Sequence, residues 1–140
     1  MKSAKYLIIA VLFLALSGCK KEEKAKERLI GSWTRVWVEV QKYDVEWTFN
    51  SDGSVFRSST SLSSSETTGD TGIYSIESKF LDYYYVIISE FERKDERGLD
   101  FNGKYRIDLL KKDLLAINRI EKVDGSEDAA YLRKEFVKSE

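Results

Sequence analysis

Apolar and polar residues alternate along the chain after residue 30, in short runs that are separated by turn-forming residues. Alternation with a period of two is typical of β-strands that bury one face. At the turn between two such runs, Asp52-Gly53 supplies residue types that accept positive φ in a hairpin. A short helix is expected over residues 24–29. The alternation predicts eight strands: residues 33–40, 45–49, 54–59, 72–77 and 83–91, a sixth with Tyr105, Ile107 and Leu109 on one face, a seventh with Leu115 and Ile117 on one face, and residues 130–136.

The lengths of the predicted connections alternate between short and long. Tight turns follow the second and sixth strands, whereas long polar segments follow the third, fifth and seventh, at residues 60–71, 92–103 and 121–128. In an up-and-down meander, alternate connections lie at opposite ends of the sheet. We therefore expect an all-β fold, a small eight-stranded up-and-down antiparallel barrel with a closed base and a rim of loops. A two-sheet sandwich also uses eight strands, but it gives no reason for this alternation.

The first residues have the pattern of a secretory signal. Two lysines precede an apolar run over residues 6–16, which is shorter than the roughly 20 residues that span a bilayer. Leu16-Ser17-Gly18-Cys19 then resembles the bacterial lipobox, in which the thiol is acylated with diacylglycerol and the chain is cut before the cysteine. The resemblance implies a lipoprotein with a signal peptide over residues 1–18, anchored in the lipid bilayer through Cys19. An ordinary secretory signal that ends in Cys is the alternative interpretation.

Residues 20–28 contain almost no apolar side chain, so we expect a solvated, charged tether over residues 19–28. Lys20 directly follows Cys19, and by resemblance to Gram-negative sorting rules a residue other than Asp there implies the outer membrane. Lys21-Glu22-Glu23 resembles a short tag that sends some lipoproteins to the cell surface. The expected location is therefore the cell envelope, with the periplasmic and surface-exposed sides of the outer membrane both left open.

The composition excludes several kinds of chemistry. The chain has no His and its one Cys is Cys19, which excludes His-ligated metals, His-based triads and a disulfide within the domain. The formal net charge is −1, unlike the basic proteins that bind nucleic acids. The acidic segments at residues 95–96 and 124–128 lack the ligand spacing of an EF-hand. We expect a protein that is not an enzyme, with no metal, no cofactor and no nucleic-acid partner.

Gly31-Ser32-Trp33, at the start of the first strand, resembles the Gly-x-Trp signature of lipocalins and related calycins. The wider pattern, over about residues 29–136, resembles the small lipocalin-like domains of bacterial lipoproteins. This resemblance implies a lipocalin-like domain over residues 29–137. In such barrels the Trp closes the base and an Arg from the last strand lies across its ring, which implies that Arg133 lies on Trp33. A guanidinium on an indole face contributes roughly 0.5–2 kcal/mol.

The first strand permits two registers. If Trp33 points inward, alternation places Arg35, Trp37 and Glu39 inward as well, in a lumen suited to an amphipathic or acidic ligand. A bulge after Trp33 would instead turn the valines at positions 36, 38 and 40 toward the core. We favour the bulge, because burying two charges costs several kcal/mol each unless they are well paired.

Two functions from different classes fit these features. The first is binding of a small apolar or amphipathic ligand inside the barrel. The second is a filled barrel that acts as a protein-interaction module or inhibitor, with an envelope or host protein as its partner. An open lumen favours the first function, and a lumen filled with side chains favours the second. The residues expected to line a ligand site are Arg35, Trp37, Trp47, Tyr85 and Tyr105.

Overall fold

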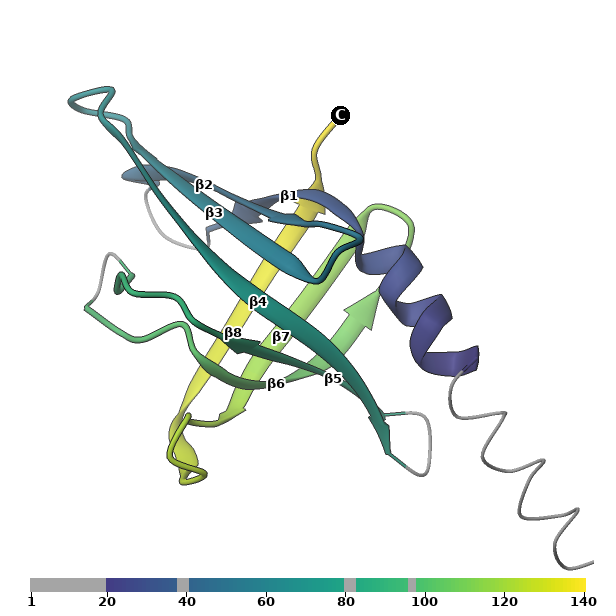
Figure 1. Ribbon diagram of the computed structural model, residues 1–140. Helices are drawn as coiled ribbons and strands as arrows, with labels where there is room; N and C mark the ends of the chain where they lie inside the picture. Colours follow the sequence, from purple (N-terminus) through teal and green to yellow (C-terminus); the bar gives the residue numbers. More distant parts are fainter. Residues whose placement is uncertain (1–19, 38–40, 80–82, 96–97) are drawn as a thin grey trace, which may run out of the picture.

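The computed structural model describes residues 20–37, 41–79, 83–95 and 98–140. These residues form a helix over residues 20–29 and eight strands (Figure 1). The strands are β1 (Gly31–Val36), β2 (Tyr43–Phe49), β3 (Ser54–Ser61), β4 (Thr67–Lys79), β5 (Tyr83–Ser89), β6 (Gly103–Leu110), β7 (Leu114–Glu121) and β8 (Glu127–Lys138).

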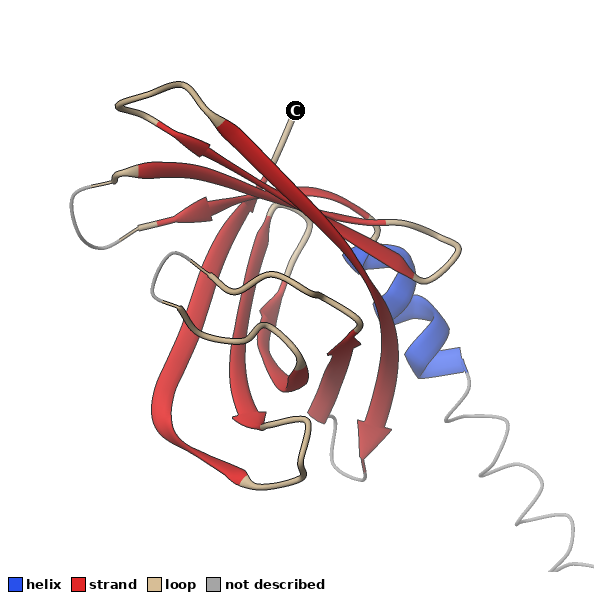
Figure 2. Ribbon diagram, turned by 60° about the vertical axis from the view of Figure 1, so that its left-hand side comes forward, coloured by secondary structure: helices blue, strands red, loops and turns tan. Residues whose placement is uncertain are grey.

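The eight strands form one closed antiparallel barrel, which confirms the predicted fold class. Each strand pairs with its neighbours in the sequence, and β8 pairs with β1, so the sheet closes on itself (Figure 2). Closure gives every strand a partner on both sides. In this topology the β1–β2, β3–β4, β5–β6 and β7–β8 connections lie at one end, which we call the rim. The other connections and the start of β1 lie at the opposite end, the base.

Two of the three long connections expected at the rim are tight hairpins. β3 and β4 extend into the Ser/Thr-rich segment and leave a turn over residues 62–66, and β7 and β8 are joined by residues 122–126. Thr60 and Thr67 face each other across the extended hairpin, with 2.8 Å between their hydroxyl oxygens. Thr is β-branched and fits a strand well, so a polar composition does not prevent pairing here. Only the β5–β6 connection is long.

The N-terminal helix (residues 20–29) begins earlier than expected and is packed on the barrel. Ala25 and Leu29 are buried, and the Glu22 carboxylate accepts hydrogen bonds from the amide and the hydroxyl of Ser78, at 2.9 and 2.8 Å. Lys, Glu, Arg and Ala all favour helix, and positions 22, 25 and 29 share one helical face. The expectation of a solvated tether over residues 20–28 is therefore wrong: the segment is a helix with one buried face.

Aromatic side chains fill the interior of the barrel. Trp47, which is 1 % exposed, is surrounded by four Phe rings whose centroids lie 5.5–6.1 Å from its own. Aliphatic side chains from β2, β3, β5 and β7 complete the packing. The four Phe residues are Phe49, Phe91, Phe101 and Phe136.

Two of those rings come from the β5–β6 connection, which folds into the rim end of the barrel. Phe91 is 5 % exposed and Phe101 is 1 % exposed. The Asn102 side chain holds the two ends of the connection together, because its amide accepts from the Phe91 N–H and donates to the Phe91 carbonyl. The Asp70 carboxylate accepts the next two backbone N–H groups, of Glu92 and Arg93. This connection thus closes the barrel interior at the rim, as the helix and Trp33 close it at the base.

Candidate functional site

Trp33 closes the base of the barrel with a different partner from the one expected. Its side chain is fully buried, and its indole N–H donates to the Leu29 carbonyl at 2.7 Å. The cation over its ring is Lys138, whose Nζ lies 4.8 Å from the ring centroid and donates to the Ile30 carbonyl. Gly31 has φ of +123°, and a Cβ there would lie 2.9 Å from Cε of Lys138. Gly31 therefore provides the space through which the lysine reaches the indole.

Arg133 does not lie on Trp33. Strand β8 continues two residues beyond the expected end, so its partner for Trp33 in the ladder is Lys138, whereas Arg133 pairs with Asn118 of β7. The Arg133 guanidinium binds carboxylates instead, Asp108 at 3.0 Å and Glu135 at 2.8 Å. The expected Trp33–Arg133 contact is therefore wrong, because the register of β8 turns Arg133 away from the interior.

Strand β1 has a regular register and no bulge between Gly31 and Val36. Val36 is 45 % exposed, so the bulged alternative, which placed it in the core, is wrong. Arg35 shares the inner face with Trp33, and its guanidinium lies 3.8 Å from the Trp37 ring centroid. The indole N–H of Trp37 is buried without a hydrogen-bond partner among the described residues. The expected positions of Val38, Glu39 and Val40 lie outside the described residues.

The five expected ligand-lining residues do not form one site. Trp47 and Tyr105 are each 1 % exposed and belong to the packed interior, where the Tyr105 hydroxyl donates to the Phe101 carbonyl at 2.5 Å. Burial raises the pKa of Tyr105. Tyr85 lies outside the barrel, between the ammonium groups of Lys104 and Lys79, at 5.0 and 5.6 Å from its ring. Arg35 and Trp37 lie against each other, apart from the packed interior that holds Trp47 and Tyr105.

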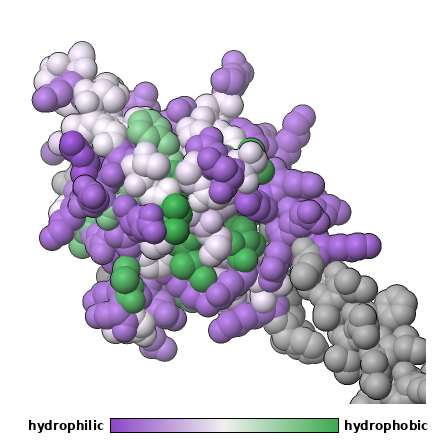
Figure 3. All heavy atoms as spheres, viewed as in Figure 1, coloured by the Kyte–Doolittle hydropathy of each residue, from purple (hydrophilic) through white to green (hydrophobic). Residues whose placement is uncertain are grey.

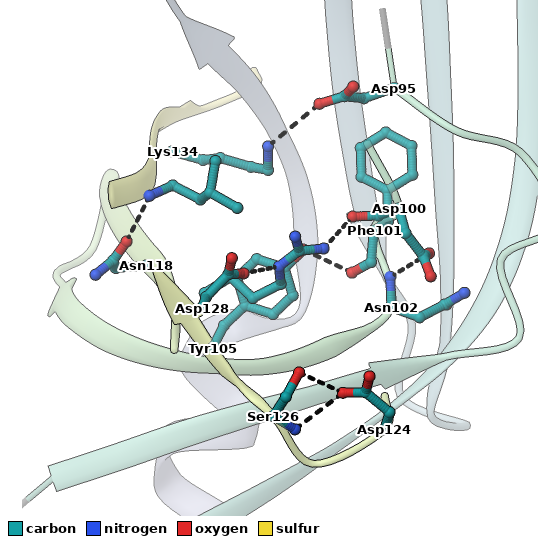
Figure 4. Close-up of polar contacts among 12 residues, drawn as sticks. Asp95, Asp100, Phe101, Asn102, Tyr105, Asn118, Asp124, Ser126, Asp128 and Lys134 are labelled. Atoms are coloured by element: carbon teal, nitrogen blue, oxygen red, sulfur yellow. Dashed lines mark hydrogen bonds and ion pairs between the residues drawn. The ribbon is translucent and has the colours of Figure 1, made fainter. Parts of the chain in front are cut away.

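A cluster of buried charges that the sequence analysis missed lies at the rim, around Phe101 (Figure 4). The Arg57 guanidinium and the Lys134 ammonium lie 4.5 and 5.8 Å from the Phe101 ring centroid. Lys134 forms an ion pair with Asp95 at 3.8 Å, and the Asp95 carboxylate also accepts from the Leu99 N–H at 2.8 Å. Arg57, Lys134 and Asp95 are each at most 8 % exposed. Arg57 lies two positions after the buried Val55, and Lys134 lies two positions before the buried Phe136. The alternation along each strand therefore places both cations on the inner face, and this pattern could have predicted them.

A second ion pair ties the rim together. Arg119, on the inner face of β7, donates to the Asp128 carboxylate of β8 and to the backbone carbonyl of Asp100. Figure 4 labels these two acceptor residues. The side chains of Arg119 and Asp128 are 6 % and 5 % exposed. The bond to the Asp100 carbonyl links β7 to the β5–β6 connection, so Arg119 helps to hold that connection in place.

A polar cavity of about 350 Å³, which we call the rim cup, opens between β2, β3, β4 and the β5–β6 connection. Arg57 and Asp95 of the buried cluster form part of its wall, and hydroxyl groups form most of the rest. The cup can therefore donate and accept several hydrogen bonds at once. It is lined by Tyr43, Arg57, Ser59, Ser61, Ser64, Glu66, Thr68, Lys94 and Asp95.

The described part of the chain contains no helix that is long and apolar enough to cross a membrane. Among the same residues, no group of three acidic side chains has a metal-binding arrangement. The proposed lipidation site Cys19 and the signal peptide over residues 1–18 lie outside the described residues.

No protein-family model matches the chain, and no curated protein matches it. Several families share a closed eight-stranded barrel, so the lipocalin-like resemblance of residues 29–137 stays a prediction.

Proposed function

We propose that this protein is a membrane-anchored lipoprotein of the cell envelope whose filled barrel is a non-catalytic protein-interaction module. Acylated Cys19 is the anchor, and the rim cup receives polar side chains of the partner. The observation that carries the proposal is the packed interior: Trp47 and its four Phe neighbours occupy the space that an apolar ligand needs. A barrel of eight strands has little other internal room.

The chemistry of the rim cup fits a polar segment of a protein. Pockets for small molecules measure roughly 300–1,000 Å³ and are mostly apolar. The rim cup, at about 350 Å³, carries hydroxyl groups and four charged groups. Its two cations, Arg57 and Lys94, are balanced by Glu66 and Asp95, so it selects neither anions nor cations by net charge. Mixed donors, acceptors and charges are what a polar peptide segment requires.

Two threonines on β4 provide a matched test. Thr68 and Thr71 are both exposed, but Thr68 lines the rim cup, whereas Thr71 pairs with Phe56 on the outer face. A photo-crosslinking amino acid at position 68, in cells that make the full chain, should capture a partner that position 71 does not. With the purified partner, Thr68→Trp should weaken binding by at least about tenfold, and Thr71→Trp should leave it unchanged.

Three results would contradict the proposal. Equal capture from both positions would remove the rim cup from the interface, and so would an unchanged affinity of Thr68→Trp. The third is a saturable change in tryptophan fluorescence on titration with fatty acids that is absent from the Trp47→Phe variant. That result would favour the binding of an apolar ligand inside the barrel as the function.

A further inference from the structure

A second hollow, which we call the base groove, lies at the opposite end of the barrel from the rim cup. It measures about 230 Å³ and separates the N-terminal helix from strands β5 and β6. Its helix wall is basic and its barrel wall is largely apolar. The groove is lined by Lys21, Lys24, Ala25, Arg28, Tyr84, Ile107, Asp108, Leu109 and Leu110.

The packing of the helix aligns the basic wall. Because Ala25 and Leu29 are buried against the barrel, the helix cannot rotate, and Lys21, Lys24 and Arg28 share the side that faces the groove. The acidic residues of the helix point elsewhere. Glu22 binds Ser78, and Glu23 and Glu27 are exposed on the side turned away from the barrel. Neither Lys24 nor Arg28 forms an ion pair with another described residue.

The one carboxylate in the groove is already neutralised. Asp108 forms ion pairs with Arg106 at 2.6 Å and with Arg133 at 3.0 Å. The groove therefore presents three cations beside an apolar floor that includes Tyr84 and Leu110, both of which pack against the core. Phosphate next to hydrocarbon is the chemistry of a phospholipid, and lysines and arginines are attracted to anionic headgroups.

The position of the groove agrees with this chemistry. The helix begins at residue 20, so Lys21 and Lys24 lie within about 6 Å of its N-terminal end along the helix axis, at 1.5 Å per residue. The headgroup layer of one leaflet is roughly 5–8 Å thick. The helix end that follows Cys19 lies on the opposite side of the molecule from the β3–β4 tip (Figure 1). Hydrophilic side chains are prominent on the helix side of the molecule in this view (Figure 3).

We infer that the base groove binds the headgroup of an anionic phospholipid in the membrane that carries the anchor. Lys21, Lys24 and Arg28 contact the phosphate, and the apolar floor takes the first part of an acyl chain. With the helix fixed to the barrel, this contact holds the rim cup away from the bilayer. The inference rests on the proposed acylation of Cys19, which a separate measurement tests.

The test uses the acylated mature protein, which begins at Cys19, in phosphatidylcholine nanodiscs that contain a rising fraction of phosphatidylglycerol. Methyl NMR signals of Ala25 and Leu110, both in the groove, should shift and saturate. The double variant Lys24→Glu/Arg28→Glu should raise the phosphatidylglycerol fraction at half-saturation by at least about tenfold. The control variant Lys42→Glu/Lys122→Glu has the same change in charge at two exposed lysines near the rim, and should leave the fraction unchanged.

Each outcome decides the inference. No saturation, or equal effects of the two double variants, overturns it. Equal shifts with inorganic phosphate, added to discs of phosphatidylcholine alone, would assign the groove to free phosphate and overturn the lipid. The intact mass of the protein reports acylation independently. An unacylated protein whose groove still responds contradicts the proposed anchor, whereas an acylated protein whose groove does not respond contradicts only this inference.

Discussion

Cations on the inner face of the barrel lie against aromatic rings. Arg57 and Lys134 flank the ring of Phe101, and Lys138 lies over Trp33. Burying a charge costs several kcal/mol unless it is compensated. An aromatic face returns roughly 0.5–2 kcal/mol, and carboxylate or carbonyl acceptors supply the rest. The interior thus accepts inward-facing cations because the same strands carry rings beside them.

The first prediction at this scale concerns Trp33. Trp33→Ala should lower the free energy of unfolding by roughly 3–5 kcal/mol, because it deletes a fully buried indole and the ring under Lys138. Urea denaturation measures the change.

Lys138→Met should also destabilise the protein, by roughly 1 kcal/mol, because it removes the cation over the Trp33 ring and the hydrogen bond to Ile30. Arg133→Met, on the outer face, should change stability least, since Asp108 keeps its ion pair with Arg106 and the exposed pair with Glu135 contributes roughly 0–1 kcal/mol. A near-neutral Trp33→Ala, or a reversed order of the two Met variants, would show that Trp33 and Lys138 do not close the base.

The second residue-scale prediction concerns alkaline pH. Burial raises the pKa of Tyr74 to about 12, with the negative charge of Asp52 as a smaller cause. Between pH 10 and 12 the unfolded chain therefore loses the Tyr74 proton while the folded chain keeps it, and stability falls as the pH rises. The loss is about 2 kcal/mol over this window.

The Tyr74→Phe variant isolates this contribution. It should flatten the decline in stability between pH 10 and 12, at the cost of roughly 1 kcal/mol at neutral pH for the lost hydrogen bond to the Asn50 carbonyl. Tyr83→Phe, at a tyrosine that is 53 % exposed, is the control. Denaturation curves collected at several pH values measure both. An equally steep decline in Tyr74→Phe would rule out Tyr74 as its cause.

At the scale of elements, strands with strict alternation could be predicted from sequence. The expected strand at residues 45–49 lies within β2, and the Asp52-Gly53 turn forms, with φ of +91° at Gly53 and the Asp52 carboxylate accepting from the Ser54 N–H. The alternation of buried and exposed residues is visible within a single strand, so each strand can be recognised from its own sequence. The inner face of β2 follows from the same pattern.

Element ends and partners were not predictable in this way. The Ser/Thr-rich hairpin has the composition of a loop, and its pairing depends on the opposite strand. The helix over residues 20–29 resembles a tether because only Ala25 and Leu29 mark its buried face. The partner of Trp33 depends on the register of β8, which is set by long-range closure with β1. A bulge at Asp108 likewise shifts β6 against β7, so Leu109 leaves the face that it was expected to share with Tyr105.

The candidate site was the least predictable part. The rim cluster brings together Arg57 of β3, Lys134 of β8 and Asp95 of the β5–β6 connection, which meet only when the barrel closes. The alternation of each strand places Arg57 and Lys134 on the inner face. It does not show that Phe101 folds in between these two side chains. Trp47 and Tyr105, two of the aromatic residues that the sequence assigned to a ligand site, form part of the core instead, because a small barrel fills its own interior.

At the scale of the whole molecule, the barrel has two chemically different ends. The rim end carries the neutral, hydroxyl-rich cup, and the base end carries the helix with its basic stripe. The helix is fixed to the barrel through Ala25, Leu29 and Glu22. A lipid on the residue before the helix would therefore determine which end faces the membrane. The proposed interaction at the rim and the proposed headgroup contact at the base are consistent for this reason.

The last prediction tests the anchor on which this orientation depends. Cys19→Ser should move the protein from the membrane fraction to the soluble fraction, and should abolish the incorporation of labelled palmitate. The apolar run over residues 6–16 is too short to hold the chain by spanning the bilayer, so the loss of the acyl chains should suffice. Lys20→Ser, one residue further on, keeps the thiol and should remain labelled and membrane-bound. Cell fractionation after an alkaline carbonate wash measures both variants. A Cys19→Ser protein that stays with the membrane would show that something other than acylated Cys19 holds it there, and the barrel would then have no fixed direction relative to the bilayer.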